Sequence, residues 1–212
     1  MWGDIMKKKM GLLLICCLMV LTPITSYAKS HDIEKNVVAR KIEVIPKEVV
    51  EADFNRQINE LLEQKREADK NKITPMAADH IYTAEVVEIK TKWVSGIPGG
   101  QPRNGTRFKQ PGGFYYSPSG GPTATSNIEF SVPFKVVSFS VNLGTAEAAT
   151  TGYTIRVPNT EDFFLLTVDN EVEIRQVNIY KQITPYSPKT LDSISYVSSV
   201  IRRVLDVVVV PM

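Results

Sequence analysis

The amino-acid sequence predicts a mainly β protein, an antiparallel β-sandwich or barrel-like domain preceded by one amphipathic helix. Between residues 79 and 210, about seven segments rich in β-branched and aromatic residues alternate in polarity, which is typical of half-buried strands. Residues 47–72 instead repeat apolar side chains every three or four positions, the period of a helix. No internal repeat at a fixed period interrupts this organisation.

The first 28 residues have the three parts of a cleavable secretory signal peptide. A positively charged stretch, Lys7–Lys9, precedes an apolar run over 11–21, and small residues occupy the two positions read by a signal peptidase in Ser26–Ala28. The apolar run falls well short of the roughly 20 residues that span a bilayer. We therefore expect cleavage after Ala28 and a secreted, extracellular product.

Removal of this leader changes the charge and the cysteine content of the chain. Three of the 25 basic residues and one of the 23 acidic residues lie in 1–28, so 22 of each remain. Both cysteines, Cys16 and Cys17, also lie in the leader. A neutral chain without cysteine lacks the charge excess typical of nucleic-acid binding and the thiols of disulfides or thiolate metal sites. We expect no cofactor, no nucleic-acid partner and no membrane attachment after cleavage.

The mature chain is expected to begin with a charged linker over 29–46 and a helix over 47–72. Pro46 suits the first helical turn, and Val50, Phe54 and Ile58 fall on one stripe. Acidic residues cluster near the start of the helix and basic residues near its end, which matches the helix dipole. This helix is expected to pack on the following domain or to form a solvated lead-in; a partner-binding or propeptide role is the alternative.

The β domain is expected over 79–210. Its strands are predicted at 80–94, 128–143, 153–157, 164–168, 172–179 and 194–210, the last of which also fits a helical period.

Three irregularities are expected among these strands. The apolar phase changes within 128–143, which predicts a bulge or bend near Val136–Val137. Asp169-Asn170 is expected to form a tight turn, and a second phase change follows between Ile174 and Val177. A ladder between Val137–Leu143 and the strand at 153–157 is expected, joined by the small-residue connection 144–152.

A Gly/Pro-rich loop is expected over 95–127, and it supplies the candidate binding residues. The segment holds eight glycines, five prolines, four aromatic residues and three basic residues, with no acidic residue. A loop of this length is usually functional or disordered, and aromatic rings beside arginines stack on sugars or polymer chains. The candidate binding residues are Arg103, Arg107, Phe108, Phe114, Tyr115 and Tyr116.

Motifs for catalysis are scarce. After cleavage only His31 and His80 remain as histidines, and no nucleophile elbow, zinc motif or phosphate-binding loop occurs. His80 follows Asp79, but adjacent strand residues point to opposite faces. Asp169, Glu171 and Glu173 share a strand face and offer oxygen ligands for calcium, but we expect them to form an exposed polar face beside a turn instead.

These observations predict a secreted, non-enzymatic binding or interaction protein that acts outside the cell. The expected partner is a cell-envelope polymer or an extracellular protein. The alternative is a secreted toxin or antimicrobial factor that acts on membranes through an amphipathic β-hairpin, because Val137–Val157 places Ser and Thr on one side and apolar residues on the other. Any half-buried hairpin shows the same pattern.

Overall fold

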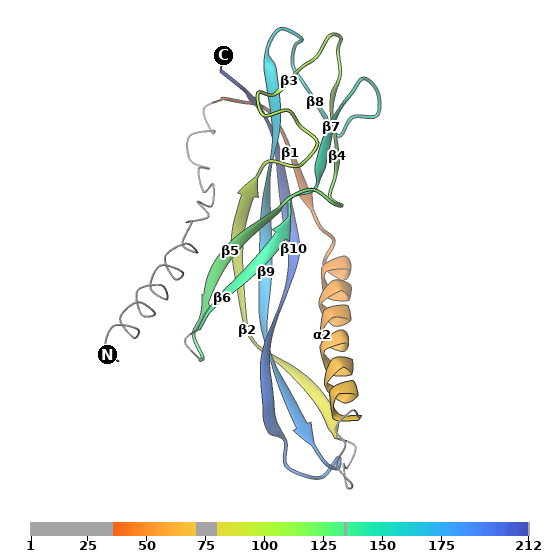
Figure 1. Cartoon of the computed structure of the whole chain (residues 1–212), viewed down its shortest axis with the longest axis vertical. Coiled ribbons are helices and arrows are strands. Elements are labelled where there is room, and N and C mark those ends of the chain that lie inside the picture. The colour runs from red at the N-terminus through yellow and green to blue at the C-terminus, as the bar shows by residue number, and fades with distance from the viewer. Residues whose placement is uncertain (1–35, 71–79, 134, 212) are drawn as a thin grey trace, which may run out of the picture. The chain divides into compact units, whose positions relative to one another are not determined.

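The computed structural model describes residues 36–70, 80–133 and 135–211, all within the unit Asp32–Met212 (Figure 1). The expected signal peptide lies outside the described residues, as do the two cysteines, His31 and Asp79. The described chain is mainly β, its sheets are antiparallel, and one helix precedes most of the strands, so the predicted fold class is confirmed. Its sheets stack in layers and do not form a closed barrel.

The central element is a sheet, called sheet A here, whose strand order is β1-β10-β9-β2. Its middle strands are long, with 20 residues each, and they pair along nearly their whole length. A short strand, β3, pairs with the start of β9 beyond the end of β2. The bounds are Val37–Val44 for β1, Thr190–Val209 for β10, Phe163–Gln182 for β9, Ile81–Gly96 for β2 and Thr106–Arg107 for β3.

Two smaller sheets cover one face of sheet A. Sheet B contains β7 (Thr145–Ala149), β4 (Gly113–Ser117) and β8 (Ile155–Arg156), in that order. Sheet C is the hairpin of β5 (Thr123–Phe130) and β6 (Lys135–Asn142), which crosses β2, β9 and β10 in Figure 1. The even-numbered residues of β9 from 164 to 174, except Asn170, are buried apolar side chains that pack against these two sheets.

Helix α2 (Lys47–Lys70) covers the other face of sheet A. Its buried Val50 and Phe54 pack on Val177 and Ile179 of β9, and Arg175 lies over the Phe54 ring at 3.8 Å. The Arg175 guanidinium also donates both terminal nitrogens to the Glu51 carboxylate, at 2.9 and 2.6 Å. The apolar stripe predicted the helix correctly because its side chains are the ones that pack on sheet A.

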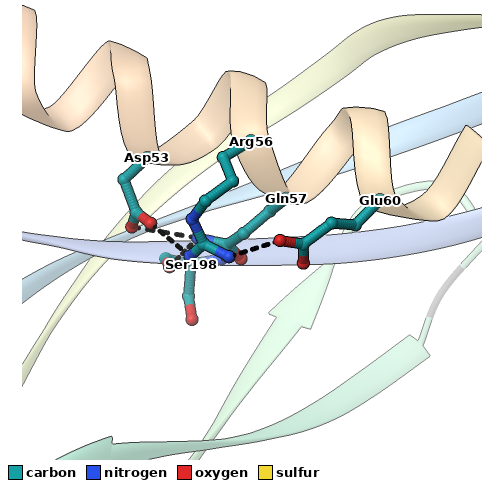
Figure 2. Close-up of polar contacts among 5 residues, drawn as sticks. All are labelled: Asp53, Arg56, Gln57, Glu60 and Ser198. Carbon is teal, nitrogen blue, oxygen red and sulfur yellow. Dashed lines mark hydrogen bonds and ion pairs between the residues drawn. The ribbon is translucent and has the colours of Figure 1, made fainter.

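A glutamine of α2 also covers the edge of β10 where β1 has ended. The Gln57 side chain donates to the Ser198 carbonyl at 2.9 Å and accepts from the Ser198 amide at 3.3 Å (Figure 2). Asp53 accepts from Gln57 at 3.0 Å and holds its amide in place. The side chain of Gln57 thus replaces a neighbouring strand at this position.

The expected charged linker contains a strand. Residues Val37–Val44 form β1, which pairs with β10 from Val208 to Arg202. The charge of this segment is neutralised locally, because Arg40 makes a two-pronged ion pair with the buried Asp206, both distances being 2.7 Å. The expectation of a linker was wrong here because cross-strand partners far along the chain accommodate the charges.

Strand β9 corrects the predicted turn at Asp169-Asn170. Both residues lie within the strand and pair with β10 on one side and β2 on the other. Asn170 is fully buried and accepts from Arg203 at 3.1 Å. The phase change between Ile174 and Val177 arises because different elements cover the two faces of β9. Sheets B and C bury the even-numbered residues up to Ile174, and α2 buries Val177 and Ile179 on the opposite face.

The phase change predicted a bulge or a bend near Val136–Val137; the structure has a turn a few residues earlier and no bulge. The apolar phase changes because the chain turns at 131–133, and β6 returns along β5 with no register shift. The expected ladder between Val137–Leu143 and 153–157 does not form; β7 and β8 pair with β4 instead. The expected loop 95–127 contains β3, β4 and the start of β5.

Candidate functional site

Three of the predicted binding aromatics belong to the core. Phe108, Phe114 and Tyr116 are buried between sheets A and B, and the first two rings meet edge to face at 5.3 Å. The Tyr116 hydroxyl donates to the Leu143 carbonyl at 3.2 Å, and burial raises the pKa of this phenol. Side chains enclosed in this way are not available to stack on a ligand.

The other three candidates, Arg103, Arg107 and Tyr115, are exposed. Arg107 donates to the Thr160 carbonyl at 3.3 Å. Tyr115 projects from the face of β4 opposite its buried neighbours. The arrangement that the sequence predicted, arginines beside accessible rings, is therefore reduced to one accessible ring.

His80 lies in a structural contact at the end of α2. Its Nδ1 is 2.8 Å from Oδ2 of Asp69, and the Tyr82 hydroxyl donates to the same oxygen at 2.5 Å. Burial, followed by the Asp69 contact, raises the pKa of Tyr82. The cluster ties the last turn of α2 to the start of β2.

Glu171 and Glu173, two of the three acidic residues considered for calcium, have cationic partners. Glu171 accepts from Arg202 at 2.7 Å, and Glu173 accepts from Arg175 at 2.7 Å. Within 36–70, 80–133 and 135–211, no group of three or more His, Cys, Asp and Glu side chains is placed to hold a metal ion. On the described face these carboxylates serve as ion-pair partners.

Hairpin β5–β6 is the most distinctive surface feature of the described chain. Directly opposed residues share a face, so the pairing separates its side chains into two sets. The outward set is polar except for Val136, and it contains Thr123, Thr125, Asn127, Glu129, Ser138, Ser140 and Asn142. The inward set is largely apolar and contains Ala124, Ile128, Phe130, Val137, Phe139 and Val141.

The hairpin stiffens itself across its outward face and exposes apolar residues at its tip. The hydroxyls of Thr125 and Ser140 are 3.0 Å apart, and Ser138 donates to the Asn127 side chain at 2.7 Å. At the tip, Val132 is 71% exposed and Val136 is 62% exposed. The two valines give the turn of the hairpin a small exposed apolar surface.

The inward face of the hairpin packs on sheet A over Val172 and Ile174 of β9 and Tyr196 of β10, whose ring centroid is 4.8 Å from that of Phe130. Polar side chains of sheet A bind the hairpin backbone around this core. The ammonium groups of Lys90 and Lys92 donate to the carbonyls of Glu129 and Asn127, at 2.5 and 2.6 Å. The Gln176 side chain donates to the Val132 carbonyl at 2.7 Å, and the Ser131 amide donates to the Glu88 carboxylate at 3.0 Å.

Glu88 holds the tip through two donors of one residue. The Ser131 amide and the Ser131 hydroxyl, at 2.8 Å, both donate to its carboxylate. These two hydrogen bonds lower the pKa of Glu88 more than its burial raises it, and Lys90 at 3.2 Å lowers it further. Glu88 is therefore held in its charged form against the hairpin tip.

The sequence reasoning named a membrane-active hairpin only as an alternative and placed it at Val137–Val157. The sequence signal for hairpin β5–β6 is the run of alternating apolar and polar residues on both sides of 131–133.

In the part of the chain that the structure describes, no helix is long and apolar enough to cross a membrane. Comparisons of the chain with protein-family models, with curated proteins and with solved structures give no match.

Proposed function

We propose that this protein is a secreted, non-enzymatic binding protein that acts outside the cell, and that the surface it binds is a lipid membrane. The observation that carries the proposal is the tip of hairpin β5–β6, where Val132 and Val136 are the accessible apolar side chains. Full removal of an aliphatic side chain such as valine from water is favourable by about 1.5–3 kcal/mol. Insertion of both valines into the acyl region of a bilayer would therefore favour membrane binding of the hairpin tip.

The rest of the hairpin has the pattern of a membrane strand pair. Thr123–Asn142 alternates between a Ser/Thr/Asn-rich face and an apolar face, as strands do when one side meets lipid and the other meets water. Its two arms have eight paired residues each, and a short extension reaches the roughly 9–11 residues of a tilted transmembrane strand. The buried rings of the 95–127 segment offer no comparable surface.

The test measures vesicle binding and dye release with tip variants. The purified secreted protein is mixed with dye-filled vesicles of phosphatidylcholine, alone or with phosphatidylglycerol, and binding is followed by flotation. We expect the native protein to bind the vesicles and release the dye. Val132→Asp and Val136→Asp should each weaken binding about tenfold or more, because a carboxylate replaces an apolar group that enters lipid.

Val44→Asp is the matched control. Val44 is 73% exposed on β1, close to the exposure of Val132, and it lies outside the hairpin. This variant should bind vesicles as the native protein does. A native protein that neither binds nor permeabilises either vesicle type contradicts the proposal, as do tip variants that bind as well as Val44→Asp.

A further inference from the structure

The apolar underside of hairpin β5–β6 is covered by sheet A in the described structure. Phe130 is completely buried, and Val141 nearly so, against Val172 and Ile174. The tip reaches solvent, but the underside reaches lipid only if the hairpin leaves the sheet. This inference rests on the proposed membrane function and concerns how that site is controlled.

The base and the tip of the hairpin are attached in different ways. At the base, the Leu143 amide donates to the Pro122 carbonyl at 2.9 Å, and the Gly99 amide donates to the Gly144 carbonyl at 2.9 Å. Gly144 has a positive φ of 76°, which a residue with a side chain rarely adopts. Backbone bonds and a glycine therefore fix the position where the two arms enter the rest of the chain.

Beyond the base, described contacts between the hairpin and sheet A are made by side chains. Strands β5 and β6 pair only with each other in the described sheets, so no backbone ladder joins them to β2 or β10. Lys90 and Lys92 bind two carbonyls along β5, and Glu88 binds both donors of Ser131 at the tip. Three side chains of β2 thus hold one edge and the end of the hairpin, and Gln176 of β9 adds a contact to the Val132 carbonyl at the tip.

The interface beneath the hairpin also contains unsatisfied polar atoms. Oε1 of Gln176 and the hydroxyl of Tyr196 are buried and have no hydrogen-bond partner among the described residues. A buried polar atom without a partner costs about 1–3 kcal/mol, which is recovered when water reaches it. Opening the interface therefore regains part of the free energy lost with the apolar contacts.

We propose that Glu88, Lys90 and Lys92 form a latch that keeps hairpin β5–β6 closed on sheet A, with Glu88 as its catch at the tip. When the Glu88 contact breaks, the hairpin swings from its base as a unit and uncovers both its underside and the face of β9 beneath it. The stiff pairing within the hairpin and the fixed base make this motion a rotation of one body. The latch sets how often the membrane-active surface is presented.

Two thiol probes on β9 test the latch in buffer without vesicles. In the secreted chain, which the expected cleavage leaves without cysteine, Val172→Cys places a thiol beneath the hairpin, and Val177→Cys places one beneath α2. Both valines are buried, at 1% and 0% exposure. The reaction rate with a soluble thiol reagent reports opening of the hairpin at the first site and opening of the helix or the whole fold at the second.

We expect Glu88→Gln to raise the labelling rate at Val172→Cys by about threefold to tenfold, because charge-assisted hydrogen bonds to Ser131 become neutral ones. The rate at Val177→Cys should not change. Glu85→Gln is the matched control, since Glu85 lies on the same strand and pairs with Lys189 rather than with the hairpin. It should leave both rates unchanged.

Two results overturn the latch: Glu88→Gln leaves the Val172→Cys rate unchanged, or it raises the rates at both probes equally. Because this assay contains no lipid, its outcome is independent of the membrane proposal. A latch that behaves as expected in a protein that never binds vesicles refutes the proposed function alone. Vesicle binding with unchanged labelling refutes the latch alone.

Discussion

Phe114 and Tyr115 are neighbours on β4 whose side chains point to opposite sides of the strand. Phe114 is fully buried against Phe108, whereas Tyr115 is 53% exposed. Phe114→Ala should therefore lower the free energy of unfolding by about 3–5 kcal/mol, because a large cavity remains in the core. Tyr115→Ala should lower it by less than about 1 kcal/mol. Urea unfolding followed by circular dichroism measures both values.

Equal losses for these two variants would contradict the assignment of Phe114 to the core. The sequence alone did not separate the two residues, because the glycines and prolines around them indicate a loop. Gly113 has a different reason to be glycine: a Cβ there would lie 2.1 Å from the Ile155 carbonyl oxygen of β8. Close packing of two strand backbones requires glycine as much as a turn does, and composition does not distinguish the two cases.

At the scale of the elements, the alternation of apolar residues predicted strands well and their connections poorly. The helix at Lys47–Lys70 follows from local periodicity, whereas the periodicity of 194–210 fitted a helix as well as the strand β10 that forms there. The single β9 did not follow from periodicity, because the turn propensity of Asp169-Asn170 is overridden by partners on both sides. The buried Asn170 side chain accepts from Arg203 through Oδ1, although its Nδ2 has no partner among the described residues.

The attachment of hairpin β5–β6 should depend on pH through Glu88. Its folded-state pKa is lowered by the Ser131 donors, so the charged contact stabilises the closed hairpin above the ordinary value of 4.5. That stabilisation should be lost as the pH falls through the lower folded-state pKa. Tyr196, whose pKa is raised first by burial and then by Glu88, stays neutral in this range. Labelling of Val172→Cys with a thiol reagent that works in acid should accelerate below pH 4.5.

The Glu88→Gln chain is the control for this pH profile. Its labelling rate should already be high at neutral pH and should not rise further over the same interval, after correction for the intrinsic reactivity of the thiol. If the native chain and Glu88→Gln show parallel profiles, the acid sensitivity arises from other carboxylates and not from the catch.

At the scale of the whole described unit, sheet A separates a helix-covered face from a face covered by two small sheets. The helix is bound by the ion pair of the partly buried Arg175 with Glu51 and by Gln57 at the β10 edge, and sheet B shares one core with β9 and β10. Hairpin β5–β6 also covers a core, but most of its polar attachments are partly or fully exposed side chains of β2, and the buried Gln176 of β9 adds one contact at the tip. Local opening is expected where buried contacts are fewest and polar contacts meet water.

This difference predicts that a tether between the hairpin and β2 abolishes membrane permeabilisation. In the secreted chain, Lys92→Cys and Asn127→Cys replace a lysine and the residue whose backbone carbonyl it binds, and the two thiols are joined by a cleavable bifunctional reagent long enough to reach the outward-facing side chain at 127. The bridged protein should release little dye from vesicles, because its underside stays closed, and cleavage of the bridge should restore release. The matched control joins Thr125→Cys to Ser140→Cys, which closes the hairpin on itself and leaves its rotation free. Equal dye release from both bridged proteins would show that the tip acts on membranes without the hairpin leaving sheet A.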